Sequence, residues 1–172
     1  MTVINIRGEA IDQTWRDVDG AGETDSLDSA VLSLTSLKEH IEALDQKSLS
    51  RIGARLTIDD NIKEVADSAK HLGLIELVFS HFKDGRPFST AVMLRRDYGF
   101  KGELRASGDI LPDQALFLIR CGFSTIAVPQ QFSVEQFRAA LSAYSVAYQA
   151  GSDDQLELVS DLRRSAVEVA AE

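Results

Sequence analysis

Short apolar runs alternate with longer segments of helical periodicity along most of the chain. The apolar runs predict strands at residues 30–34, 54–58, 74–79, 102–107 and 123–128. Between and after these runs, apolar side chains three and four residues apart predict helices at about 36–49, 61–72, 86–98, 112–121 and 133–149. Strands that alternate with helices of this length are typical of βα units around a parallel sheet.

The predicted helices carry recognisable end signals. Two of them open with a proline, which suits the first turn, and the last one starts with Ser133 and Gln136 at capping-box spacing. Three end in a glycine followed by an apolar residue, a position where a left-handed residue commonly closes a helix. These glycines are Gly73, Gly99 and Gly122. The repeated ending indicates that the βα units are built alike.

Within the predicted strands, polar side chains alternate with apolar ones. Arg55, Glu76, Glu103 and Arg105 each stand between less polar neighbours, whereas parallel strands buried on both faces read as continuous apolar runs. Helices therefore cover one face, and the other is a barrel-like polar interior, an open surface or a dimer interface. We predict an α/β fold of repeated βα units with a mainly parallel sheet, half-barrel or barrel-like. A Rossmann-like three-layer sandwich is the alternative.

The domain organisation follows from the extent of this pattern. Residues 1–150 are predicted to form a single α/β domain, in which residues 1–28 supply irregular strands and a polar, turn-rich loop. Residues 151–172 form an acidic tail. This tail is either a weak helix that docks through Leu156, Val159 and Leu162, or disordered.

Composition narrows the function classes. A net charge of −9 argues against binding the nucleic-acid backbone. The sequence has no apolar run long enough to cross a bilayer and no signal-peptide pattern at its start, so neither a membrane nor a secretory route is expected. Cys121, the single cysteine, excludes an internal disulfide and a four-thiolate cluster within one chain. A reducing, cytoplasmic setting is the prediction, with Cys121 as a small buried residue.

Candidate chemistry gathers where the predicted strands end. Ligands of parallel sheets and barrels bind at the carboxyl ends of the strands, and the loops there carry acids, an arginine and His81. Arg86 stands at a helix start, where the helix dipole disfavours a cation, so Asp84, Asp109 or a bound anion should compensate it. Arg105 extends this candidate anion site if it points toward the same edge.

The two acids that follow the predicted strand at 102–107 can be interpreted in two ways. Asp109 and Asp113 could act as a general acid and base, since neighbouring carboxylates can hold different pKa values, or they could cap a helix and complement its dipole. Gln114 could bind a ligand or a backbone group. We therefore assign Asp109 and Asp113 as candidate catalytic residues, and Asp84, Arg86, Arg105 and Gln114 as candidate ligand-binding residues. No His/Cys metal site is expected, and no dinucleotide or phosphate-loop motif is present.

Residues 79–123 resemble a bacterial family of uncharacterised proteins that is catalogued as predicted oxidoreductases of sulfite reduction. The resemblance is specific in order and spacing, and it extends more loosely over residues 30–150. Phe79-Ser80 and Pro87 depart from the family pattern, where proline and glycine are common. The matching motifs are Asp84-Gly85-Arg86, Gly102-Glu103-Leu104-Arg105-Ala106, Gly108-Asp109, Asp113-Gln114 and Arg120-Cys121-Gly122-Phe123.

The resemblance implies a pathway, because members of that family belong to gene neighbourhoods of sulfate assimilation. It implies an accessory protein or an oxidoreductase, with the sulfite reductase haemoprotein or its reductase as partner. A redox role would need a flavin or a nicotinamide bound by loops without a known motif, or a partner that holds the electrons. Two other hypotheses come from the residues themselves: an oxyanion-binding enzyme at the loop edge, and a homodimer joined through the polar sheet face.

Overall fold

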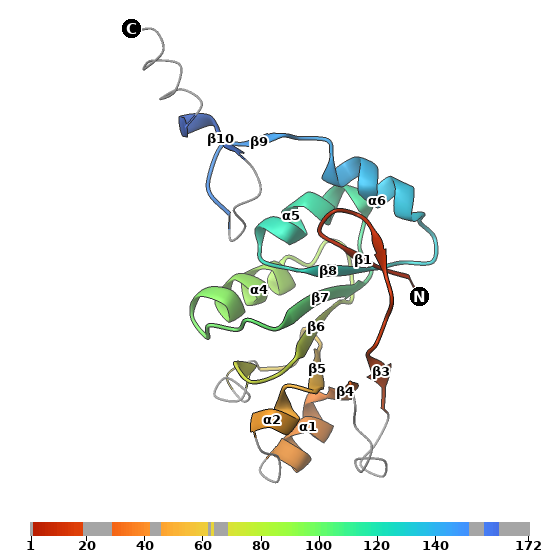
Figure 1. The fold of residues 1–172 in the computed structure, drawn as a ribbon, viewed down its shortest axis with the longest axis vertical. Helices are drawn as coiled ribbons and strands as arrows, with labels where there is room; N and C mark the ends of the chain where they lie inside the picture. The colour runs from red at the N-terminus through yellow and green to blue at the C-terminus, as the bar shows by residue number, and fades with distance from the viewer. Residues whose placement is uncertain are drawn as a thin grey trace, which may run out of the picture.

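The computed structural model describes residues 2–18, 29–41, 46–61, 63, 69–151 and 157–161 (Figure 1). The predicted loop within residues 19–28 and half of the predicted helix at 61–72, namely residues 62 and 64–68, lie outside the described residues. The same holds for most of the predicted acidic tail. Its expected docking residues Leu156 and Leu162 are among those not described.

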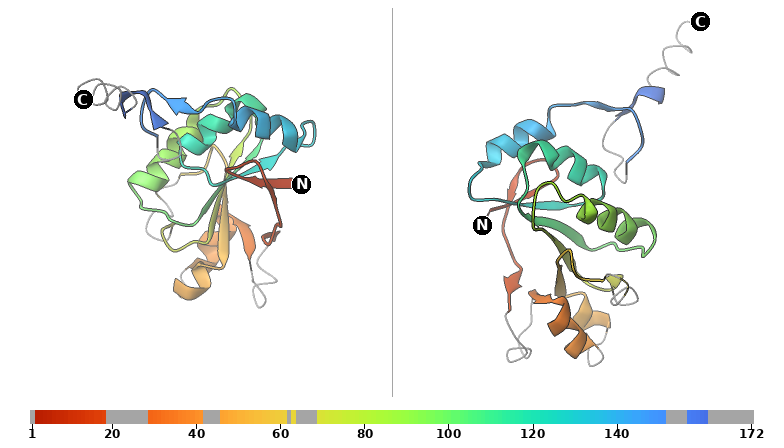
Figure 2. Two further views of the ribbon diagram at one scale, coloured as in Figure 1. Left: turned by 45° about the horizontal axis from the view of Figure 1, so that its top comes forward. Right: turned by 180° about the vertical axis from the view of Figure 1, so that it is seen from behind.

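Eight strands form one curled sheet, which confirms the predicted half-barrel of βα units (Figures 1 and 2). The strand order is β2-β1-β8-β7-β6-β5-β4-β3. Strands β3 to β8 pair in parallel with their neighbours, and β1 pairs antiparallel with β2 and β8. The strands are β1 (Thr2–Asn5), β2 (Ala10–Ile11), β3 (Arg16–Asp17), β4 (Ala30–Ser33), β5 (Ile52–Leu56), β6 (Leu74–Phe79), β7 (Glu103–Gly108) and β8 (Thr125–Val128).

The helices follow their strands as the pattern predicts, with two differences. The segment predicted as one helix at 36–49 contains α1 (Leu34–Ile41) and α2 (Gln46–Leu49). The helix predicted at 112–121 opens as a 3₁₀ turn, η3 (Pro112–Gln114), before α5 (Ala115–Arg120). The remaining helices are α4 (Arg86–Arg96) and α6 (Val134–Leu141).

The prediction of a helix from 133 to 149 is wrong in its second half. Helix α6 begins with the expected capping box, in which Gln136 Oε1 accepts from the Ser133 N–H at 2.8 Å. It ends at Leu141: the next residue, Ser142, has left the helical conformation (φ −92°, ψ 2°), and its hydroxyl donates to the carbonyls of Arg138 and Ala139. The chain then becomes extended, and β9 (Val146–Ala147) pairs with β10 (Glu157–Leu158).

The glycine helix endings are confirmed at two of three positions. Gly99 and Gly122 have φ values of 64° and 101°, in the left-handed region. Gly73 is not left-handed, and a different constraint applies to it: there is no room for a side chain. A Cβ at this position would lie 2.2 Å from the Ser50 carbonyl oxygen and 2.7 Å from Trp15.

The two faces of the sheet differ as the alternation predicts. Apolar side chains of the strands join a core with residues of the covering helices, such as Ala91 and Leu94 of α4 and Leu118 of α5. On the opposite face, strand register places four polar residues in one row: Arg55, Glu76, Arg105 and Thr125. We call these four residues the polar row.

A segment near the N-terminus spans the sheet. Strands β2 and β3 are consecutive in the chain but occupy opposite edges of the sheet, so residues 12–15 run from one edge to the other (Figure 1, red). Trp15 in this segment donates its indole N–H to Glu103 on β7 at 2.9 Å. We call residues 12–15 the strap.

Candidate functional site

The polar row is organised by Glu103, which lies beside it on β7. Arg105, 2% exposed, donates to Glu103 Oε1 from Nη2 at 2.8 Å and from Nε at 3.1 Å. The same oxygen accepts from the Thr125 hydroxyl at 2.7 Å, while Oε2 accepts from Trp15. The guanidinium of Arg105 therefore turns toward the N-terminal part of its own strand, not toward the carboxyl edge.

Ion pairs continue across the other half of the row. Arg55 donates to Glu76 Oε2 at 3.1 Å and also pairs with Asp17 of β3. Burial lowers the pKa of Arg55, but the attraction of Glu76 and Asp17 outweighs burial and raises it above its ordinary value. Pairing between Arg and Glu on neighbouring strands is thus present for Arg55 and Glu76, whereas Arg105 pairs within its own strand.

At the carboxyl edge, two of the candidate site residues hold the loop after β6. The Asp109 carboxylate accepts from the backbone N–H of Phe82 at 3.1 Å, and the Gln114 amide donates to the Phe82 carbonyl at 2.7 Å. Gln114 also accepts from the Leu111 N–H at 3.1 Å. Asp109 and Gln114 therefore hold the backbone of one loop residue, Phe82, through its N–H and its carbonyl.

Asp84 and Arg86 meet as an ion pair in the same loop. Asp84 accepts from the Arg86 backbone N–H at 3.0 Å and from Arg86 Nη2 at 2.7 Å. Hydrogen bonds from the Arg86 side chain and backbone lower the pKa of Asp84, and the same side-chain bond raises the pKa of Arg86. The cation at the start of α4 is compensated by this pair. Asp113 is separate from the loop contacts: it is exposed on η3 and lines a groove between α5 and α6.

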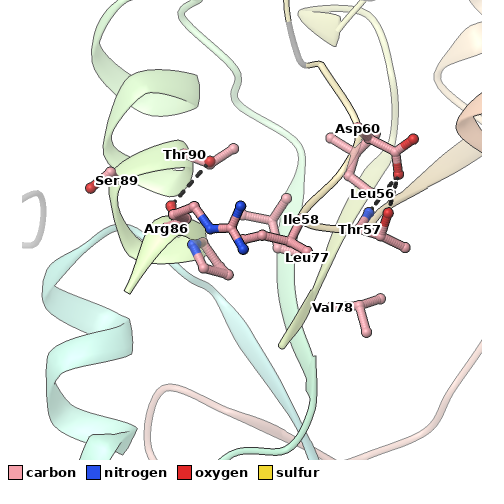
Figure 3. Close-up of a pocket in the computed structure, with 10 residues that line it drawn as sticks. Leu56, Thr57, Ile58, Asp60, Leu77, Val78, Arg86, Ser89 and Thr90 are labelled. Atoms are coloured by element: carbon pink, nitrogen blue, oxygen red, sulfur yellow. Dashed lines mark hydrogen bonds between the residues drawn. The ribbon is translucent and has the colours of Figure 1, made fainter. Parts of the chain in front are cut away.

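A pocket of about 300 Å³ opens beside Arg86 (Figure 3). Arg86 extends from the start of α4 toward Ile58 and Leu77, and its side chain is 66% exposed. Across the pocket, Asp60 accepts from the Thr57 N–H at 2.6 Å and from its hydroxyl at 2.8 Å. The pocket can admit a small anion to the outer side of the guanidinium.

The structure adds an exposed aromatic surface that the sequence reading missed. Phe117, Tyr144 and Tyr148 are 55%, 68% and 79% exposed. Two of them border a groove of about 420 Å³ between α5 and α6, which we call the aromatic groove. It is lined by Asp113, Leu116, Phe117, Arg120, Ala140, Ala143 and Tyr144.

A signal for the aromatic groove was present in the sequence. The segment Ala115 to Ile119 is apolar at every position, which is more than one buried stripe of a surface helix requires. Tyr144 gave no signal, because the predicted continuation of α6 assigned it to a helix that ends three residues earlier.

The described residues offer neither a metal site nor a membrane span. Among them, no group of three or more His, Cys, Asp or Glu side chains is placed to hold a metal ion. Within the same part of the chain, no helix has the length and apolar character needed to span a membrane.

Fold and site together define a half-barrel protein of βα units with a buried polar row, a charged loop edge and an exposed aromatic groove. Residues 53–159 match the model of a bacterial family of proteins of unknown function (DUF934), so the chain belongs to that family. No curated protein and no solved structure matches the chain. The matched region includes the loop edge, the polar row and the aromatic groove. Membership confirms the resemblance at the level of an uncharacterised bacterial family.

Proposed function

We propose that this protein is an accessory protein of assimilatory sulfite reduction that works by binding the sulfite reductase haemoprotein. The pathway is taken from the resemblance of residues 79–123. The binding role is supported by one observation: aromatic side chains stay exposed around the aromatic groove, while charges at the loop edge are engaged in holding their own loop.

The aromatic groove has the properties of a docking surface. Aromatic residues are enriched at protein interfaces, and contiguous exposed apolar patches commonly mark them. The Phe117 ring packs against Phe88 with ring centroids 4.8 Å apart, so it is held in place before a partner arrives. A preorganised aromatic side chain loses little conformational entropy on binding, which favours affinity. Asp113 and Arg120 at the margin offer a polar rim.

In this proposal the electrons for sulfite reduction are carried by the partner. The purified protein is then expected to be colourless, without the visible absorption of a bound flavin. A stoichiometric flavin spectrum, or a fluorescent nicotinamide that stays bound through gel filtration, would contradict the accessory role and favour an oxidoreductase.

Binding can be measured with the immobilised haemoprotein and the full-length chain in solution. We expect saturable binding that Tyr144→Ala weakens by about tenfold or more, in the range of an interface hot spot. Phe82→Ala is the matched control, because Phe82 is another exposed aromatic residue but lies on the loop edge. No binding by the wild-type chain, or equal affinities for Tyr144→Ala and wild type, would overturn the proposal.

A second candidate function is an oxyanion-binding enzyme at the loop edge. It is favoured by the pocket beside Arg86, whose guanidinium is mostly exposed although Asp84 pairs with it. In such an enzyme, Asp109 would act as the general acid or base. The test is thermal unfolding of the protein with sulfite, sulfate, phosphate, FMN, FAD, NADH and NADPH. A rise in Tm with one of these that Arg86→Ala abolishes would favour the enzyme, and an unchanged Tm throughout would remove it.

A further inference from the structure

The amino edge of the sheet, opposite the loop edge, holds a second and larger cavity. It has a volume of about 840 Å³ and lies between the last turn of α4, the last turn of α5 and the segment that ends at Gly151. Four basic side chains line it, in a chain with a net charge of −9. They are Arg95, Arg96, Lys101 and Arg120. Among the described residues that line this cavity, there is no Asp or Glu.

Three of these four cations lack a carboxylate partner among the described residues. Arg96 is compensated, because its Nε lies 2.8 Å from the Asp97 carboxylate, and this contact lowers the pKa of Asp97. Arg120 donates only to the carbonyl of Gln149, and neither it nor Lys101 makes an ion pair within the described part of the chain.

Arg95 is fixed at the wall of the cavity by neutral groups. Its Nη1 donates to the carbonyls of Phe100 and Gly102, both at 2.9 Å, and its Nε donates to the Gly122 carbonyl at 2.9 Å. Carbonyl dipoles orient this guanidinium without neutralising it, and burial lowers its pKa. A part-buried cation with no counter-charge is costly, and a bound anion would relieve that cost.

Helix dipoles explain part of this arrangement but not all of it. Cations in the last turn of a helix are favoured by the dipole, which accounts for Arg95, Arg96 and Arg120 as single residues. It does not account for Lys101, which follows the end of α4 and the left-handed Gly99. Nor does it require that all four side chains line the same cavity.

We infer that this cavity binds a small molecule that carries two or more phosphate charges. Three cations without a carboxylate partner among the described residues match a di- or trianion, and the volume lies within the range of small-molecule sites, well beyond what a single inorganic ion fills. The inference is independent of the proposed partner, since the aromatic groove and this cavity share only Arg120.

The test is isothermal titration calorimetry of the full-length chain with pyrophosphate, ADP and FMN as separate probes. We expect saturable binding of at least one probe at low salt, and a loss of affinity of about tenfold or more with Lys101→Glu. Lys101 is exposed and borders only this cavity among the three described pockets, so the variant should fold. Equal wild-type and variant Tm values will verify this. Binding of pyrophosphate alone would define a polyphosphate site, and tighter binding of ADP or FMN a nucleotide site.

Lys83→Glu is the matched control, with the same change of charge at the opposite edge. Lys83 follows β6, whereas Lys101 precedes the parallel strand β7, so the two lysines lie at opposite ends of the sheet. The inference predicts unchanged affinity for Lys83→Glu. No binding of any probe, equal affinities for Lys101→Glu and wild type, or a loss confined to Lys83→Glu would overturn it. The affinity of the haemoprotein for Tyr144→Ala is a separate measurement, so either proposal can fail alone.

Discussion

Glu103 links three separate parts of the molecule. Its two carboxylate oxygens accept four hydrogen bonds, from Arg105 twice, from Thr125 and from Trp15. These contacts join β7, β8 and the strap through one side chain. Because Arg105 is 2% exposed, its charge depends on Glu103 for compensation. Removing one partner of a buried ion pair is far more damaging than replacing both.

Glu103→Gln is therefore expected to lower the free energy of unfolding by about 3 kcal/mol, because it leaves the Arg105 charge buried without its counter-ion. Urea unfolding measures this loss, and the emission of Trp15, the single tryptophan, reports whether the strap detaches. Glu39→Gln removes an exposed carboxylate on α1 and should change stability by less than about 0.5 kcal/mol. The double variant Glu103→Gln, Arg105→Met should recover part of the loss. Equal stabilities of Glu103→Gln and Glu39→Gln would refute the role given to Glu103.

Some of these side-chain contacts can be predicted from the sequence, and others cannot. Residues two apart on a strand share a face, so the pairing of Glu103 with Arg105 could have been expected from spacing alone. The sequence left open whether Arg105 points toward the loop edge, and in the structure it points toward Glu103 instead. Which of several acids a long side chain selects depends on rotamers and neighbouring strands, and the sequence does not specify these.

The loop between β6 and α4 is held by four of the predicted site residues. Asp109 and Gln114 bind the backbone of Phe82, and Asp84 and Arg86 pair where the loop meets the helix start. A loop held from both sides keeps Arg86 at a fixed position beside the pocket. The observed contacts of these residues are thus with the loop itself.

The ion pair of Asp84 and Arg86 in this loop leads to a prediction of pH dependence. Because hydrogen bonds from Arg86 lower the pKa of Asp84 in the folded state, the pair stabilises the loop above the unfolded pKa of about 3.9. That contribution is lost as the pH falls through the lower, folded pKa. Arg86→Ala should raise the pKa of Asp84 toward about 3.9, as measured by carboxyl-carbon NMR titration. Arg7→Ala, which removes an exposed arginine elsewhere, should leave it unchanged. An unaltered Asp84 titration in Arg86→Ala would contradict the pairing.

At the level of elements, the sequence predicted the strands better than the helix ends. The apolar run placed β6 at its observed bounds, because apolar residues interrupted only by Glu76 cover the whole strand. The end of α6 at Leu141 is marked by neither glycine nor proline, so the sequence does not show where this helix stops. The need for glycine at position 73 comes from the close approach of Ser50 and Trp15, which are remote in sequence. Contacts of that kind follow from the packing and leave no periodic signal.

The whole molecule keeps three surfaces apart. The sheet fixes a loop edge and an amino edge at opposite ends of its parallel strands, and α5 and α6 carry the aromatic groove along one side. The sequence could predict the loop edge, since parallel strands bring their carboxyl ends together. It could not predict the other two surfaces. They depend on how neighbouring helices end and on which side chains those ends leave exposed.

We propose that the protein acts through the aromatic groove and not through chemistry at the loop edge. The most direct test uses a strain that lacks the gene for this protein. Single variants are expressed in this strain, and its growth is measured with sulfate as the sole sulfur source. We expect Tyr144→Ala to fail on sulfate and to grow normally with cysteine, while Arg86→Ala restores growth on both. The opposite result, in which Tyr144→Ala restores growth and Arg86→Ala does not, would contradict the account and place the function at the loop edge.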